Sequence, residues 1–188
     1  MRIRLSIFIA LIFINFVNGQ TRKLNLIVGT FISSSNSDGI FVYGFDPQSG
    51  NFNYTSKFAI ENPLYIAISQ DGKNVCSVNT VRIGGISAFA FNSNSGDLTF
   101  LNRVNSGGNN PSYIVIDDEN KFVFVSNYGS GSLIAVSFLI DGSLSTNFQL
   151  NKQPWSSIDK NRQTRSHVHS AVLSPDNRYL LTPNLGTD

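Results

Sequence analysis

The chain has 188 residues, of which 41% are hydrophobic and 14% charged, a balance that indicates one globular domain and excludes an intrinsically disordered chain. Its 14 Lys and Arg stand against 12 Asp and Glu, and without Arg2 and Arg4, which lie in a removable leader, basic and acidic residues are equal in number. Because no run of Lys or Arg remains, we expect no nucleic-acid partner. The one cysteine, Cys76, has no second cysteine to pair with, and the apolar residues around it predict a buried thiol.

The first nineteen residues have the pattern of a secretory signal peptide. A positively charged start precedes an apolar stretch over residues 5–17, and the small residues Val17 and Gly19 suit the subsites of a signal peptidase. A transmembrane anchor is the alternative, but about 13 apolar residues are fewer than the roughly 20 that span a bilayer. We therefore expect residues 1–19 to be cleaved off before Gln20, and a secreted or periplasmic protein that is free of the membrane.

From there on the sequence repeats with a period close to 48 residues. The segment 62–69 (NPLYIAIS) recurs as 110–117 (NPSYIVID), and the turns that follow contain Lys73 and Lys121, at an offset of 48. A third copy, residues 166–174 (SHVHSAVLS), follows an insertion. Repetition at this period is typical of folds built from stacked units.

Each copy contains further segments with the period-2 alternation of β-strands. The second segment is found at residues 27–30, 75–79 and 123–127, the third at 39–45, 85–91 and 131–138, and the fourth follows a Gly-containing turn, as at 97–101. Four short strands per unit cannot bury both faces alone, so successive sheets must stack. The pattern therefore predicts an all-β fold, a β-propeller of four-stranded antiparallel blades.

The length sets how many blades the chain can form. The residues from Gln20 onward, divided by the period, give about 3.5 blades, which is fewer than the four to eight of closed propellers. A chain that ends at Asp188 in mid-blade would expose a long sheet edge, which natural proteins avoid. We expect residues 20–188 to be the incomplete N-terminal half of a propeller, with a dimer of half-propellers as the alternative.

These segments together resemble one known family. They include Val28-Gly29-Thr30, the strand 39–43, the Asn-Tyr-Gly-Ser-Gly-Ser loop at 127–132, and the stretch from Arg162-Gln163 through His167-Val168-His169 to Leu185-Gly186-Thr187-Asp188. On these motifs the chain resembles the seven-bladed β-propeller lactonases, the 6-phosphogluconolactonase family of the cycloisomerase-2 type. The resemblance implies seven blades and hydrolysis of a sugar lactone, or in a related fungal branch formation of a lactone from a muconate, without a metal or other cofactor. We expect a monomer that acts on a small-molecule lactone.

Three positions depart from the family's usual residues. Ser166 stands where the family usually has proline, Asn184 where it usually has aspartate, and Thr80 where glutamate is frequent. The family's catalytic Arg and Glu come from the blade after the histidines, so the resemblance implies that they lie beyond Asp188. On this basis we expect the chain to hold only part of an active site.

His169 is the expected catalytic residue. The repeat register places it at the position of Leu64 and Ser112, just ahead of the innermost strand, where side chains reach the mouth of the central channel. It also matches the family's functional histidine, so it could activate water or stabilise the leaving alkoxide. A histidine that only hydrogen-bonds at a blade junction is the alternative. His167, two residues away, is expected to face the same side and bind substrate, and without a third ligand nearby we expect no metal site.

Arg162 and Arg165 are expected to bind an anionic group of the substrate, because guanidinium groups make two-point contacts with carboxylates and phosphates. Both lie in the insertion, and solvated loop charges are the alternative. Asn127 and Tyr128 are expected to line the same mouth, with Asn127 binding substrate, although Asn and Gly residues of such loops more often form tight turns. Tyr65 and Tyr113 share one register position and are expected to be structural.

A secreted binding or scaffold module is the alternative function, since the Pro-x-x-Ile-Ala-x-Ser-x-Asp-Gly-Lys pattern of residues 63–73 also resembles the YVTN surface-propeller repeats. A scaffold would repeat its units uniformly, whereas the copy at 166–174 replaces Asn-Pro by His-x-His and follows an insertion. This asymmetry favours an enzyme. Export would favour a non-phosphorylated lactone, because phosphorylated pentose-pathway sugars are found in the cytosol.

Overall fold

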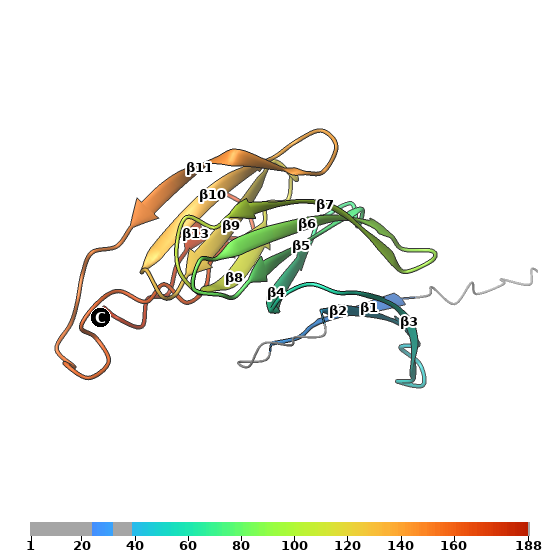
Figure 1. The fold of residues 1–188 in the computed structure, drawn as a ribbon, viewed down its shortest axis with the longest axis horizontal. Coiled ribbons are helices and arrows are strands. Elements are labelled where there is room, and N and C mark those ends of the chain that lie inside the picture. Colours follow the sequence, from blue (N-terminus) through green and yellow to red (C-terminus); the bar gives the residue numbers. More distant parts are fainter. Residues whose placement is uncertain (1–23, 32–38, 188) are drawn as a thin grey trace, which may run out of the picture.

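The computed structural model describes residues 24–31 and 39–187, so the expected leader lies outside the described residues. Thirteen strands of this part form four antiparallel sheets of three, four, four and two strands. No helix in this part is long and apolar enough to cross a membrane. Figure 1 shows the sheets following one another as successive blades, from β1–β3 to the C-terminal strands. The prediction of an all-β, propeller-type fold is confirmed.

Each sheet is built from strands in chain order. The first contains β1 (Leu24–Gly29), β2 (Ile40–Phe45) and β3 (Phe52–Phe58); the second β4 (Pro63–Ile68), β5 (Asn74–Asn79), β6 (Gly85–Asn92) and β7 (Asp97–Asn105). The third contains β8 (Pro111–Ile116), β9 (Phe122–Asn127), β10 (Ser132–Phe138) and β11 (Leu144–Lys152), and the fourth β12 (Val172–Leu173) and β13 (Leu180–Leu181). In the repeat register β1 corresponds to β5 and β9, so the first sheet consists of the second to fourth strands of its unit.

The backbone repeats as the sequence does. The turn between the first two strands of each unit has a left-handed residue at one register position, with φ of 69° at Gly72, 55° at Asn120 and 58° at Asn177. Glycine adopts this conformation freely and asparagine is the side-chain-bearing residue that tolerates it best. The alignment of the three copies is therefore correct to the residue at this turn.

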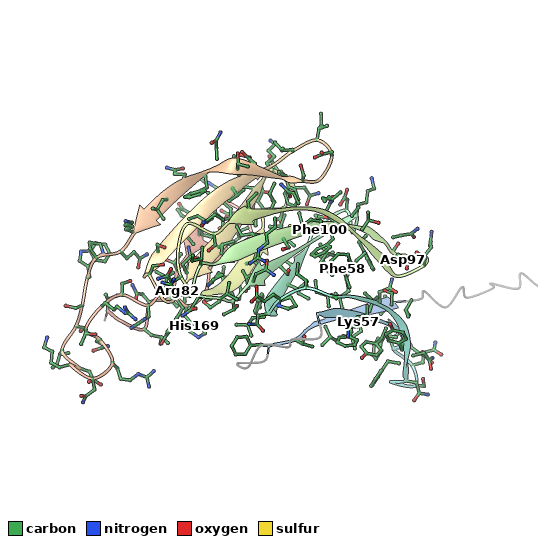
Figure 2. All side chains as sticks on the ribbon, in the orientation of Figure 1. Lys57, Phe58, Arg82, Asp97, Phe100 and His169 are labelled. Carbon is green, nitrogen blue, oxygen red and sulfur yellow. The ribbon has the colours of Figure 1, made fainter. Side chains whose placement is uncertain are left out.

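The core lies between the faces of successive sheets. Phe58 of β3 packs edge-on against Phe89 of β6, with ring centroids 5.0 Å apart, and stacks on Phe100 of β7 at 6.1 Å (Figure 2). Between the second and third sheets, a larger cluster of fully buried aliphatic side chains includes Val78 and Ile134. Cys76 belongs to the same cluster and is fully buried, as predicted. Burial of this kind holds each blade to its neighbour, since no covalent crosslink does.

The copy at 166–174 differs from the other two. In place of a long innermost strand, its first half makes one isolated bridge, Val168 to Asn184, and only the two-residue strands β12 and β13 pair beyond it. In the complete sheets the second strand is hydrogen-bonded on both sides, as β5 is by β4 and β6. In the described residues β13 has a partner on one side only, which leaves the fourth sheet less regular.

Candidate functional site

The main chain around His169 is tied to the start of β8. The amide N–H of His169 donates to the carbonyl of Pro183 at 3.0 Å, and its carbonyl accepts from Oγ of Ser112 at 3.0 Å. Ser112 is the second residue of β8, one of the innermost strands. The His169 side chain is exposed, and it lies at this end of the sheets in Figure 2. The register prediction for His169, at the end of an innermost strand, therefore agrees with its contacts.

Tyr128, the first residue after β9, contacts both histidines. Its ring stacks on the imidazole of His167 with centroids 4.5 Å apart and an interplanar angle of 25°. The imidazole of His169 meets the same ring at 5.7 Å and 87°, in an edge-to-face arrangement. The two histidines thus face a common side, as alternate residues of an extended segment do, and the phenol ring of Tyr128 joins them.

His167 is held at several atoms. Its Nδ1 lies 3.1 Å from the carbonyl oxygen of Tyr128, its main-chain N–H donates to Oδ1 of Asn184 at 2.8 Å, and its carbonyl accepts from the N–H of Leu185 at 3.0 Å. The side chain is half-buried. His167 is therefore the more rigid of the two histidines.

Asn184 links the segments that meet below the histidines. Its Nδ2 donates to Oε1 of Gln153 and to Oγ of Ser166, both at 2.6 Å. Its Oδ1 accepts from the main-chain N–H of His167 and from that of Gly186 at 3.0 Å. Ser166 is only 3% exposed, and Asn184 and Gln153 are half-buried, so these bonds are partly shielded from water.

Two glycines allow the chain segments to approach one another here. A Cβ on Gly186 would lie 1.9 Å from the carbonyl oxygen of Arg165, and one on Gly131 would lie 2.6 Å from Cβ of Ser166. Gly131 also has a φ of 59°, in the left-handed region. A side chain at Gly131 would push the histidine segment away from the loop that carries Tyr128, and one at Gly186 would push it away from the segment that carries Asn184.

Arg162 and Arg165 lie on the insertion and are exposed. Internal hydrogen bonds shape this loop, among them Gln163 N–H to the carbonyl of Asp159 at 2.6 Å. In the described part of the chain, neither guanidinium makes an ion pair. The two arginines are close to the histidines in sequence, and their charges are free for an anion. Their predicted role stays a prediction.

Asn127 is fully buried. Its Nδ2 donates to the carbonyl of Ser106 at 2.7 Å and contacts Oγ of Ser132 at 3.3 Å. Asn79, at the same register position, likewise donates to the carbonyl of Glu61 at 2.7 Å. Both amides bind the linker between two blades, so the side chain of Asn127 lies beneath the site and has no surface on which to meet a substrate.

The sequence places Tyr128 at this mouth together with Asn127 without giving it a role, and it leaves Arg82 out. Tyr128 belongs to the Asn-Tyr-Gly-Ser-Gly-Ser loop at 127–132, and its contacts with the two histidines depend on the fold. Arg82 is exposed in the β5–β6 turn, whose Val81 carbonyl accepts from the N–H of Asn110 at 3.1 Å, next to β8. In Figure 2 Arg82 and His169 lie at the same end of the sheets. A single arginine in a turn carries no sequence signal.

In the described residues, no three His, Cys, Asp or Glu side chains are grouped so that they could hold a metal ion. The two imidazoles offer nitrogen atoms that can donate or accept hydrogen bonds, and the exposed guanidinium groups of Arg82, Arg162 and Arg165 can pair with an anion.

Comparison with known proteins gives a consistent result. Residues 25–188 match the family model described as "Lactonase, 7-bladed beta-propeller". A 6-phosphogluconolactonase of Formosa agariphila is 34% identical over 167 residues, covering 87% of this chain and 47% of that protein. A 6-phosphogluconolactonase of Bacillus subtilis is 31% identical, covering 86% of this chain and 46% of that protein.

Among solved structures, the periplasmic gluconolactonase PpgL of Pseudomonas aeruginosa superimposes with a TM-score of 0.80 at 31% identity. That match covers 87% of this chain and 48% of the Pseudomonas chain. The chain therefore spans about half the length of the relatives that it matches.

Proposed function

From its membership of the seven-bladed β-propeller lactonase family, we propose that this chain is part of an enzyme that hydrolyses a sugar lactone. The proposal is supported above all by one observation: the two histidines that interrupt the repeat meet on the ring of Tyr128, at the end of the innermost strands. The relatives described as 6-phosphogluconolactonase or gluconolactonase act on the same class of compound by their names.

His169 is the proposed catalytic residue, because its imidazole is exposed while its main chain is fixed on both sides by Ser112 and Pro183. As general base it takes a proton from water, whose oxygen attacks the lactone carbonyl carbon. The tetrahedral intermediate then collapses, the ring C–O bond breaks, and the proton on His169 passes to the leaving alkoxide. One water is consumed and one hydroxy acid is formed.

Arg162 and Arg165 are the proposed partners of an anionic group on substrate or product, because both guanidinium groups are exposed and without an ion pair in the described residues. His167 is proposed to bind substrate beside His169. For the buried Asn127, the proposed role is to support the blade linker through the carbonyl of Ser106, without contact to the substrate. Further catalytic groups are expected from the rest of the propeller.

A non-phosphorylated sugar lactone is the substrate class that we favour, because we propose that the protein is exported from the cytosol. The leader pattern of residues 1–19 suggests export, and the similar Pseudomonas enzyme is described as periplasmic. A secreted binding module remains the second candidate, since the repeat itself would serve either purpose.

The test is an assay of the protein as its gene encodes it, with glucono-1,5-lactone and 6-phosphogluconolactone as substrates. Acid release is followed in a pH-stat and corrected for spontaneous hydrolysis. We expect turnover that falls by about 10²- to 10⁴-fold in His169→Ala, with Tyr179→Ala, an exposed residue outside the site, as the matched control. Wild-type protein without activity on either lactone would contradict the proposal and favour the binding module.

A further inference from the structure

We propose that Tyr128 is a positioning residue that fixes the tautomer of His167, so that Nε2 of His167 becomes a dedicated acceptor for a substrate hydroxyl. The inference rests on the proposed lactone site and deepens it, because it names the substrate group that the second histidine reads. It also gives separate tasks to two histidines that are alike in sequence.

The tautomer follows from the partner of Nδ1. A carbonyl oxygen can only accept a hydrogen bond, so Nδ1 of His167, 3.1 Å from the carbonyl of Tyr128, carries the hydrogen. A neutral imidazole has one N–H, and its other nitrogen then presents a lone pair. No hydrogen bond to Nε2 of His167 is formed by the described residues, which leaves this lone pair for a ligand.

The ring cannot easily turn to reverse this assignment. The face of the imidazole lies on the Tyr128 ring at 4.5 Å, so rotation about its side-chain bonds would lose both the stack and the hydrogen bond. The Tyr128 carbonyl is itself held in place, because the N–H groups of Tyr128 and Gly129 donate to the carbonyls of Asn110 and Asn109, at 3.2 and 3.0 Å. Asn184 holds the main chain of His167 from the other side.

His169 lacks these restraints. Its imidazole meets the Tyr128 ring perpendicularly, without a stack, and no hydrogen bond of its ring nitrogens is formed by the described residues. It can therefore gain and lose a proton during a reaction, which suits a general base. His167, with a fixed lone pair, selects a group that has an O–H to donate. Sites of this kind discriminate strongly against analogues without the hydroxyl.

Nitrogen NMR of the histidine side chains in isotope-labelled protein tests the tautomer without any assay of activity. The chain has only two histidines, and His169→Ala assigns their signals. At about pH 8, where imidazole is mostly neutral, we expect His167 with a protonated Nδ1 and a bare Nε2. Tyr128→Ala keeps the main-chain carbonyl that binds Nδ1 but removes the ring that holds the imidazole against it. We therefore expect part of His167 to shift to the Nε2–H tautomer that free imidazole favours, whereas Tyr128→Phe and the control Tyr179→Ala should show no shift. Wild-type His167 with a protonated Nε2 would overturn the proposal. Because this measurement uses the wild-type protein, it tests the tautomer even if Tyr128→Ala does not fold.

The kinetic test compares kcat/KM for glucono-1,5-lactone with that for δ-valerolactone, which has no hydroxyl groups. We expect the preference for the hydroxylated lactone to fall about tenfold in Tyr128→Ala and in His167→Ala, the effect of one lost hydrogen bond. Tyr128→Phe should retain it. An unchanged preference in folded Tyr128→Ala would overturn this inference alone. A wild-type protein that hydrolyses neither lactone would overturn the proposed function, while the tautomer measurement would still stand.

Discussion

Nδ2 of Asn184 donates a 2.6 Å hydrogen bond to Oγ of Ser166, which joins two positions where the family resemblance implies other residues. The aspartate implied at position 184 has no side-chain N–H to donate, and the proline implied at position 166 has no hydroxyl to accept. The two departures are therefore chemically matched to each other. Because Oδ1 of Asn184 also accepts from the N–H of His167, the pair supports the segment that carries both histidines.

Loss of this pair should destabilise the protein in a coupled way. We expect Asn184→Ala to lower the free energy of unfolding by about 1–3 kcal/mol, since it leaves several partly buried partners unsatisfied. Ser166→Ala should cost less in the Asn184→Ala background than in wild type, with a coupling of about 1 kcal/mol. Urea denaturation of the four proteins measures this cycle. Strictly additive effects would show that the bond contributes nothing to stability.

Asn127→Ala tests whether this buried amide binds substrate or supports the blade linker. Its bond to the carbonyl of Ser106 lies in a fully buried region, so we expect a loss of about 1–3 kcal/mol in unfolding free energy. Asn79→Ala, at the same register position, should behave alike and serves as the matched control. KM for glucono-1,5-lactone, measured on the folded fraction, should stay unchanged in both. A raised KM in Asn127→Ala with full stability would restore the substrate-binding role.

The fold could be predicted from the sequence because each repeat carries the same local signals. Gly72, Asn120 and Asn177 occupy one register position and all adopt a left-handed backbone, so the turns fix where each strand begins. Alternation marks the segments as strands, but central strands such as β5 are buried on both faces, because a blade covers each side. The copy at 166–174 aligns in sequence with β4 and β8, yet it forms only one isolated bridge and the short strand β12.

The candidate site could be predicted only in part. His167 and His169 stand out because they break a repeat, which is a signal in the sequence itself. Tyr128 contacts both histidines only because the chain folds back on itself. About forty residues, including the insertion, separate Tyr128 from the histidines, and local sequence does not predict such a long-range contact. Asn127 is next to Tyr128 in sequence, but it is the buried last residue of β9, whereas Tyr128 begins the turn that follows.

Acid should destabilise the turns in which serine and aspartate side chains pair. Oγ of Ser69 donates to Asp71 at 2.7 Å, and this bond holds the pKa of the Asp71 carboxyl below its usual value of 3.8. Ser174 lowers the pKa of Asp176 in the same way. The unfolded chain therefore takes up protons at a higher pH than the folded one, so this stabilisation is complete above about pH 4 and is lost as pH falls through the lowered values.

Thermal unfolding of wild type and Ser69→Ala across this range checks the acid prediction. The variant should lose part of the stability difference between neutral and acidic pH, since its Asp71 has lost the serine donor. Ser95→Ala, in an exposed turn whose serine accepts from the N–H of Asp97, is the control and should keep the wild-type profile. If the unfolding temperature fell in parallel with pH in all three proteins, the hydrogen bond between Ser69 and Asp71 would not be a source of the acid sensitivity.

Alkaline pH should destabilise the folded protein through Tyr65 of β4 and Tyr113 of β8, two of the innermost strands. The rings of Tyr65 and Tyr113 lie 4.2 Å apart, and the hydrogen bond to Tyr65, with partial burial, raises the pKa of Tyr113 from 10.0 to about 12. The unfolded chain releases this proton first, so the stabilisation is present below about pH 10 and is lost as pH rises toward 12.

Tyr65→Phe should move the titration of Tyr113 back toward its ordinary range, which ultraviolet absorbance of the tyrosinate measures. Tyr54→Phe, an exposed tyrosine of β3, should leave it in place. If Tyr113 titrated normally in wild type, the two rings would be packed together without a shared hydrogen bond, and their contact between β4 and β8 would stabilise the blades by apolar burial alone.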